Sequence, residues 1–498
     1  MRSIYGRKRD RARALFTGGR TQGIEVQAIE KDGIRVSLWD MAGQQEFHAF
    51  HDCMFPDIGT SSYQLPSMFM FVWSPMDSKN TKKGVVKNEK NFQASFRYWL
   101  RFLASKSRQS NITLKVIVVL TRADQMATLS HAFTAPIASL RSDFKGVIDI
   151  IDPPFHVDAR KKDSMRVVAS HIFEIAKHML QGIQVYKICT DINKLLSEHL
   201  KNTNEGIITW ETFGKIYPTS DKAKLEAVAL CLNESGNIIY INGIRHIVLN
   251  PNWFCNKVMG SLIHFSNFEA SRSTIPLQDG CTPRHSLEDC LQSVVKSKVK
   301  GSLLVDLMEA MHLCCKVTIS NGVPNSLVDH IFIPTLLADG GTIEKLQWRS
   351  LATRKVDDDT FVYMGRRLEC EDKDHTFLTP GLFPRVQVIF NKAFQSLEGE
   401  YKANVMLGKD FISICFPNKE IIVVFCQANA EHVIGVLVRA NNPNNNQRHT
   451  PTTSVDMELK CIINALVTIC AQPTSIQGVK LIECHPAGLL ILSVNGAK

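Results

Sequence analysis

The sequence lacks any apolar run long enough to cross a membrane. Its 498 residues contain no stretch near the ~18 apolar residues that a spanning helix needs, and runs such as Leu114–Leu120 have the length of a strand. No internal repeat of roughly 20–50 residues is visible, which excludes a solenoid. The basic N-terminus has no apolar segment and does not resemble a signal peptide. We expect globular domains, about three by length, and no transmembrane segment.

Closely spaced cysteine pairs of the CxxC type are also missing. The 14 cysteines are at closest adjacent, as Cys314 and Cys315, or nine positions apart, as Cys281 and Cys290. Neither spacing is that of a zinc site. Because most of them stand within apolar runs, we interpret them as small buried side chains of a protein in a reducing compartment. This usage predicts a cytoplasmic location.

Excess charge is confined to the N-terminal end. The chain has 58 Lys and Arg against 48 Asp and Glu, a net charge of +10, and residues 1–20 hold seven basic side chains and one acidic one. This cluster is either a solvated chain end or a contact for phosphates or an acidic surface. The other residues lack the basic stripe of a nucleic-acid-binding protein, so we expect no nucleic-acid partner.

Several catalytic motifs are absent as well, namely HExxH, GxSxG and the kinase triplets HRD and DFG. His48 and His51 could form a metal-binding pair, but no third ligand is evident beside them. The pair Cys484 and His485 is best interpreted as packed or surface side chains. The sequence therefore gives no support to a metalloprotease, an α/β-hydrolase or a kinase.

What is present in the first third is a pattern of alternating strands and helices. Strands are predicted at 23–29 and 33–39 around a tight turn at Asp32-Gly33, and at Met68–Trp73, Leu114–Leu120 and Phe155–Val157. Helical spacing is found at 91–104, 127–140 and 165–179. Buried strands that alternate with helices predict a doubly wound α/β sheet.

The pattern changes near residue 185. Helical stretches at 185–200 and 222–232, followed by two short strands around Asn242-Gly243, predict a winged-helix-like order. Pro251 is predicted to open a further helix. Strands then return, and are predicted at 331–334, 360–364, 386–390, 411–416, 421–427 and 433–439.

The strongest local signal is DMAGQQEF at 40–47, directly after a predicted strand. An aspartate at the carboxyl end of such a strand faces the ligand crevice of an open α/β sheet, where Asp40 can hold Mg²⁺. Gly43 has no side chain, so its N–H can approach a terminal phosphate closely. Gln44 can orient an attacking water.

Two further strand ends supply matching chemistry. Thr21 precedes the first strand of the hairpin and can offer a metal-binding hydroxyl that responds to a γ-phosphate. Asp124, in the segment TRAD at 121–124, follows the next buried strand. Its carboxylate can accept two hydrogen bonds from the N1–H and N2 amine of guanine, a donor pair that adenine lacks.

In this order, RTQGI, DMAGQQEF and TRAD resemble the Ras-like G domain, called Roc, of the Roco family, and most closely its plant TORNADO-type members. FHVDA at 155–159 stands where that family has its last nucleotide loop, which implies a role for Ala159. VLNPNW at 248–253 and LTPGLFPR at 378–385 are similar to the COR module that follows Roc. The resemblance covers roughly residues 18–440.

One departure from the family pattern is large. The phosphate-binding motif GxxxxGK[ST] is absent, and so is the strand that precedes it, which lies centrally in a Ras-like sheet. We expect that Met1 is an internal methionine of a longer protein; a Roco variant that has abandoned nucleotide is the other explanation. Thr121 and Arg122 stand where many G domains have asparagine and lysine, and the planar Arg122 can still stack on a base.

The resemblance thus implies an incomplete Ras-like doubly wound α/β sheet, without its first strand and P-loop, and an α+β COR module. The expected boundaries are 1–183 for the partial Roc domain, 184–325 for a helical, winged-helix-like first half of COR, 326–440 for its β-rich second half, and 441–498 for a linker and C-terminal segment. The expected nucleotide-binding residues are Thr21, Gly43, Thr121, Arg122, Asp124 and Ala159, with Asp40 and Thr21 on the metal and Gln44 on the water.

For function, the resemblance implies a GTP-dependent signalling scaffold that binds GTP or GDP with Mg²⁺. It also implies slow hydrolysis in the intact protein, a homodimer through COR, protein partners and leucine-rich repeats upstream. Without the P-loop, we expect impaired nucleotide binding and no hydrolysis in this chain. The alternative is a nucleotide-independent interaction and dimerisation module with an inactive G-domain remnant.

Overall fold

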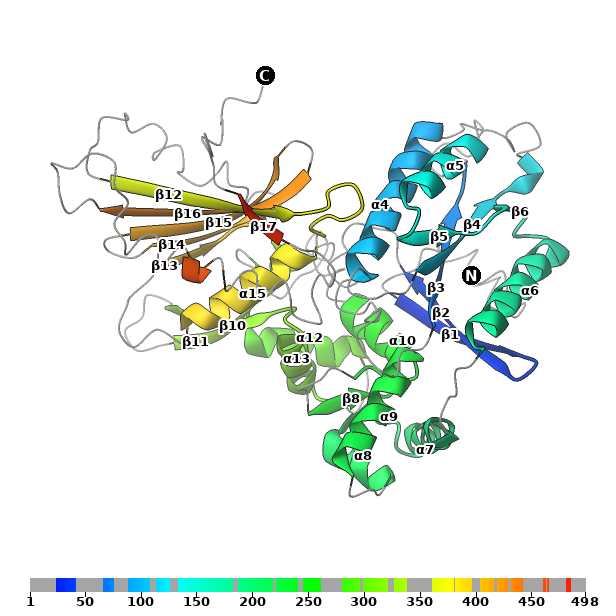
Figure 1. Ribbon diagram of the computed structural model, residues 1–498. Helices are drawn as coiled ribbons and strands as arrows, with labels where there is room; N and C mark the ends of the chain where they lie inside the picture. Colours follow the sequence, from blue (N-terminus) through cyan, green and yellow to red (C-terminus); the bar gives the residue numbers. More distant parts are fainter. Residues whose placement is uncertain are drawn as a thin grey trace. The chain divides into compact units, whose positions relative to one another are not determined.

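The computed structural model describes residues 24–41, 66–75, 88–107, 113–125, 133–181, 187–217, 221–240, 245–260, 280–295, 299–320, 327–337, 361–379, 381–395, 404–415, 419–428, 431–441, 460–462, 464 and 481–484. They form two compact units, one of the described residues up to Gly260 and one of those from Gly280 on (Figure 1). No helix within these ranges is long and apolar enough to span a membrane. The expected domain boundaries stay predictions.

The first described elements of the first unit form an antiparallel hairpin. Strands β1 (Ile24–Lys31) and β2 (Ile34–Met41) pair in register from Ile24 opposite Met41 to Lys31 opposite Ile34. Both residues of the connecting turn have positive φ, 51° at Asp32 and 76° at Gly33. Two consecutive positive φ angles match the right-handed twist of the strands and suit Asp-Gly. The hairpin is placed as the sequence predicted.

A parallel sheet forms the centre of this unit. It contains β3 (Met68–Trp73), β4 (Leu114–Thr121), β5 (Ile148–Ile150) and β6 (Phe155–Val157), and both β5 and β6 pair with β4 (Figure 1). Val118 of β4 is fully buried, whereas Val72 of β3 is 49% exposed. Among the described strands, β3 pairs with β4 alone and β2 with β1 alone, so β3 is an edge of the described sheet.

Helices lie on both faces of the parallel sheet. Phe71 of β3 stacks on Phe96 of α4 (Glu89–Ser107) at 4.6 Å between ring centroids, and α4 packs beside α5 (Thr134–Asp143). Ile117 of β4 instead packs with Ile172 of α6 (Lys162–Met179). Because Phe71 is in register with Val118, the residue after Ile117, these contacts lie on opposite faces. This arrangement fits the expected doubly wound α/β fold.

The rest of the first unit is mainly helical. Its elements are α7 (Lys187–Thr203), β7 (Ile207–Thr209), α8 (Trp210–Ile216), α9 (Lys222–Glu234), β8 (His246–Val248), α10 (Pro251–Trp253) and a π-helix, η4 (Phe254–Met259). Ile192, Phe213, Val228 and Ile247 meet in its core. Of the expected hairpin around Asn242-Gly243, the described residues show one bridge, between Ile239 and Val248, and Val248 also pairs with Ile207 of β7.

The described residues of the second unit form two antiparallel sheets. The smaller has the order β10 (Cys315–Ser320), β11 (Leu327–Phe332), β9 (Cys281–Pro283). The larger has the order β13 (Asn404–Leu407), β14 (Phe411–Cys415), β15 (Lys419–Ala428), β16 (Glu431–Asn441), β12 (Phe361–Cys370), β17 (Leu481–Cys484). Helices α12 (Arg284–Val295) and α13 (Gly301–Ala310) precede β10, and the 3-10 turn η5 (Pro334–Leu336) follows β11.

The strand expected at 386–390 is wrong, because these residues belong to helix α15 (Leu382–Gln395). Leu382, Val386 and Phe390 pack on the larger sheet with Val423 and Val436. A short apolar run is compatible with a buried strand and with a buried helix, and periodicity alone does not separate them. The spacing of the three inward residues, four apart, is the helical signal that decides.

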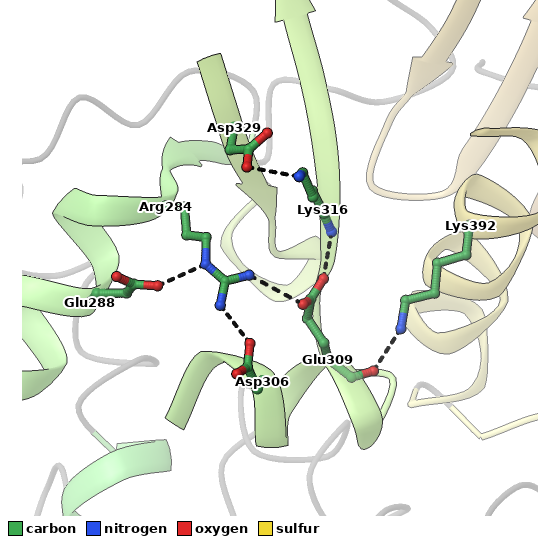
Figure 2. Close-up of polar contacts among 7 residues, drawn as sticks. All are labelled: Arg284, Glu288, Asp306, Glu309, Lys316, Asp329 and Lys392. Atoms are coloured by element: carbon green, nitrogen blue, oxygen red, sulfur yellow. Dashed lines mark hydrogen bonds and ion pairs between the residues drawn. The ribbon is translucent and has the colours of Figure 1, made fainter. Parts of the chain in front are cut away.

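An ion-pair network joins the helices of the second unit to its smaller sheet (Figure 2). Arg284 at the start of α12 contacts Glu288 at 2.7 Å, Asp306 at 2.5 Å and Glu309 at 3.5 Å. A Glu309 carboxylate oxygen accepts the backbone N–H of Lys316 at 2.8 Å, and its carbonyl accepts from Lys392 Nζ of α15 at 2.7 Å. One guanidinium thus serves three carboxylates and fixes α12 against α13.

Candidate functional site

Three of the expected site residues, Thr21, Gly43 and Gln44, lie outside the described residues, as do His48 and His51. Asp40 is described. It is the penultimate residue of β2, opposite Glu25 of β1, and it is half-buried. The carboxylate therefore stands at the carboxyl end of its strand, as the motif predicts, but on the two-stranded sheet. Within the described ranges, no group of three His, Cys, Asp or Glu side chains could hold a metal ion.

The described part of the candidate site is the carboxyl end of β4. Thr121 is its last residue, and its hydroxyl donates to the backbone carbonyl of Trp73 at the end of β3, at 3.1 Å. Arg122 follows with a φ of 62°, a left-handed conformation that costs a non-glycine residue about 1–2 kcal/mol. The chain then turns into a short 3-10 helix, Ala123–Gln125 (η3), which carries Asp124. Strained backbone of this kind is often found at binding sites.

Strand β6 brings a second loop to the same place. Thr121 of β4 is in register with Val157 of β6, and the two strands are parallel. The loops that follow them therefore leave the same edge of the sheet. Asp158, Ala159 and Arg160 form the second of these loops, which runs into α6. Asp124 and Ala159, which the sequence placed at one nucleotide site, thus stand on neighbouring loops.

Asp158 is the buried anchor of this loop, with 5% of its surface exposed. One of its carboxylate oxygens accepts the backbone N–H of Arg160 at 3.0 Å and its Nε at 2.9 Å, and the other accepts Nη2 at 3.1 Å. Its own N–H donates to the hydroxyl of Ser164 at 3.0 Å. The hydrogen bonds from Arg160 hold the pKa of the Asp158 carboxyl below its ordinary value.

Arg160 also reaches the expected base-recognition residue. Its Nη2 lies 2.8 Å from Oδ2 of Asp124. Hydrogen bonds to Asp158 and the nearby charge of Asp124 raise the pKa of Arg160, and its guanidinium is always protonated. The Arg160 side chain is 72% exposed and that of Asp124 is 26% exposed. The Arg160 bridge, meaning Arg160 with Asp124 and Asp158, therefore places a cation on the solvent side of a half-buried carboxylate.

The β1–β2 hairpin, which carries Asp40, is held by the helical part of the first unit. The side-chain amide of Asn252 pairs with both backbone groups of Val26, accepting its N–H and donating to its carbonyl. Asn256 Nδ2 donates to the carbonyl of Ile24 at 3.2 Å. These groups lie on the edge of β1 that faces away from β2. Asn252 and Asn256, the hairpin clamp, therefore cap an edge that would otherwise be open to other strands.

Comparison with family models gives no match. Among curated proteins, the chain is 29% identical over 427 residues to TORNADO 1 of Arabidopsis thaliana, a match that covers 79% of this chain. The chain resembles plant Roco-type proteins. It spans 29% of the length of TORNADO 1. Among solved structures, the GDP-bound RocCORdC part of Roco2 from Methanosarcina barkeri matches at a TM-score of 0.39 and 18% identity, covering 65% of this chain and 90% of that one.

In this Roco-like chain, Asp158 and Arg160 are site residues that the sequence motifs do not predict. Both flank Ala159, to which the resemblance does assign a role, and the sequence shows that their opposite charges stand two positions apart. What the sequence does not show is that Arg160 reaches a carboxylate 36 positions earlier in the chain, since that contact depends on the register of β4 and β6.

Proposed function

We propose that the chain is the Roc–COR part of a GTP-binding signalling scaffold. The observation that carries this proposal is the meeting of two loops at the carboxyl ends of β4 and β6, with Asp124 on one and Ala159 on the other. The similarity to TORNADO 1 over most of this chain supports it. In this reading, the first unit contains the G-domain part, and COR begins within its helical region.

Asp124 would select guanine. Its two carboxylate oxygens can accept the N1–H and the N2 amine of the base, and charged hydrogen bonds of this type are stronger than neutral ones. Arg122 would stack on the base, and the loop at Ala159 would close its far side. Thr121 would support the loop rather than contact the ligand, because its hydroxyl donates to Trp73.

Mg²⁺ and phosphate would be held by the hairpin and the segments beside it. Asp40 and Thr21 are the oxygen ligands that suit Mg²⁺, which in such sites neutralises phosphate charge. Gly43 would approach the terminal phosphate and Gln44 would orient water. Since GxxxxGK[ST] is absent from this sequence, we propose that nucleotide binding is impaired here and that slow hydrolysis belongs to the intact protein.

The strand partners agree with this proposal. A Ras-like sheet would have one more strand between β2 and β3, and in the described part of the chain each of these has one partner. The partly exposed apolar side chains of β3 are those that an additional strand would cover. We further propose a cytoplasmic protein that forms a homodimer through COR and binds protein partners.

The alternative is a nucleotide-independent interaction and dimerisation module with an inactive G-domain remnant. The absence of the P-loop motif favours it, and so does the pairing of Asp124 with Arg160. The two functions predict different titrations. A GTP-binding module gives saturable binding of GTP and GDP with Mg²⁺, weak in this chain and tight in a chain extended upstream.

The control is a matched pair of carboxamide variants. Asp124→Asn should abolish the preference for guanine, whereas Asp163→Asn, at a carboxylate that is 90% exposed on α6, should change nothing. Absence of binding in both the short and the extended chain would leave the interaction module. Light scattering of the same samples, with and without GTP, tests the homodimer.

A further inference from the structure

The exposure of the Arg160 bridge determines what it can do. The contact between Arg160 and Asp158 has three hydrogen bonds and a buried carboxylate, whereas the contact between Arg160 and Asp124 is a single one at 2.8 Å. Exposed ion pairs are weak, and both partners here reach solvent. The Asp124 contact is therefore the one that opens first, with Arg160 still held by Asp158.

The occupied atom is one that a guanine base needs. Recognition of guanine by a single carboxylate uses both of its oxygens, one for N1–H and one for the N2 amine. Arg160 Nη2 lies within hydrogen-bond distance of Oδ2 of Asp124. A bound base and Arg160 therefore compete for the same oxygen, and the guanidinium also offsets the negative charge that attracts the two base donors.

We propose that Arg160 is a specificity-determining positioning residue that acts through Asp124: its guanidinium occupies one oxygen of the Asp124 carboxylate and must pivot on Asp158 before a guanine base binds. This inference rests on the proposed nucleotide function and adds to it a competitor built into the site. It makes the affinity for guanine lower, and the discrimination between guanine and hypoxanthine smaller, than Asp124 alone would give.

The test is a titration of the whole chain with GDP and Mg²⁺, followed by ligand-observed NMR, which measures weak binding. Arg160→Gln should bind GDP about two- to fivefold more tightly than the unchanged protein, the range set by the strength of an exposed ion pair. The same substitution should increase the affinity for inosine diphosphate, which lacks the N2 amine, by a smaller factor. Arg160→Lys keeps the charge without the planar fork, so its affinity for GDP should fall between those of the unchanged protein and of Arg160→Gln.

Two further variants separate this effect from a general loosening of the loop. Asp158→Asn removes the anchor of Arg160 but leaves the guanidinium free to stay on Asp124, so it should not raise the affinity for GDP. Arg166→Gln removes the same charge from an exposed pair with Asp163 on α6 and should leave both nucleotides unchanged. A structural role alone would not change the ratio of GDP to inosine diphosphate affinities.

The possible outcomes distinguish the inference from the proposed function. Tighter GDP binding by Arg160→Gln, with an increased GDP preference, supports the competition. Equal or weaker GDP binding, while the unchanged protein binds and Asp124→Asn does not, overturns the role of Arg160 and leaves the proposed function in place. If neither the unchanged protein nor Arg160→Gln binds GDP in the short or the extended chain, the nucleotide function fails and the competition fails with it.

Discussion

The hairpin clamp makes a sharp prediction about the coupling of β1 to the helical part of the first unit. Asn252→Ala removes two side-chain hydrogen bonds to Val26 and leaves its N–H and carbonyl at a partly closed edge, with Val26 itself 8% exposed. A typical hydrogen bond contributes about 0.5–1.5 kcal/mol, and an unsatisfied buried group costs about 1–3 kcal/mol. Since water can reach part of this edge, we expect a loss of about 2–3 kcal/mol in local stability.

Hydrogen exchange measures this loss directly. The β1 segment, Ile24–Lys31, should exchange about 30- to 150-fold faster in Asn252→Ala, as the energy range requires. Asn252→Asp should be at least as harmful, because a carboxylate next to the Val26 carbonyl cannot donate to it. Asn202→Ala, at an exposed position of α7, is the matched control and should leave β1 unchanged. If β1 exchanges at the same rate in Asn252→Ala and in the control, the clamp does not stabilise the hairpin.

Three other predictions concern a glycine, an arginine and a histidine. Gly236 has a φ of 68°, and a Cβ there would lie 2.8 Å from Nε1 of Trp39. Gly236→Ala should therefore destabilise the first unit by more than Gly33→Ala, where φ is 76° but no atom lies within 4 Å of the added Cβ. Denaturant titrations of the two variants measure this difference in the free energy of unfolding. Arg284→Met should cost about 1–3 kcal/mol because three carboxylates lose their shared cation, whereas Lys316→Met breaks an exposed pair with Asp329 and should cost at most about 1 kcal/mol, both measured by calorimetry. Burial and the nearby Arg385 and Lys392 lower the pKa of His312 to about 4. Because His312 takes up its proton at a higher pH in the unfolded state than in the folded one, the second unit should lose stability as the pH falls from about 6.5 to 4, by at most about 3 kcal/mol. His312→Asn, in which asparagine tolerates the φ of 57°, should reduce that loss. A pH profile that is the same with and without His312 would contradict this assignment.

The sequence predicted the parallel sheet because its strands carry strong local signals. Met68–Trp73 is a continuous apolar run and Leu114–Leu120 is interrupted only by Lys115, a composition typical of the strands of a parallel sheet covered on both faces, and both strands lie at those residues. The turn at Asp32-Gly33 was equally readable, since few dipeptides accept two positive φ angles. The apolar run at 386–390 gave a wrong prediction, because the helical spacing of Leu382, Val386 and Phe390 becomes visible only when Leu382, before the run, is included.

The site was harder to predict than the sheet, and the reason is physical. Motifs placed Asp40 and Asp124 at strand ends, which is information carried by a few neighbouring residues. The partner of Asp124 depends instead on the parallel register of β4 and β6, and the partner of Val26 stands 226 positions away. Contacts of that range are fixed by packing of whole elements, which no local pattern encodes.

The segment NPNW at 250–253 shows how local and distant roles combine in one motif. Asn250 accepts the N–H of Trp253 at 3.0 Å and caps the helix that Pro251 begins, so two of the four residues serve the local backbone. That cap fixes the direction of the helix, and the direction presents Asn252 to the edge of β1. Asn252, which lies in the helical part of the first unit, therefore also holds the hairpin that carries Asp40. Weakening the cap by Asn250→Ala should loosen β1 as well, through Asn252, although Asn250 itself makes its capping bond within its own helix.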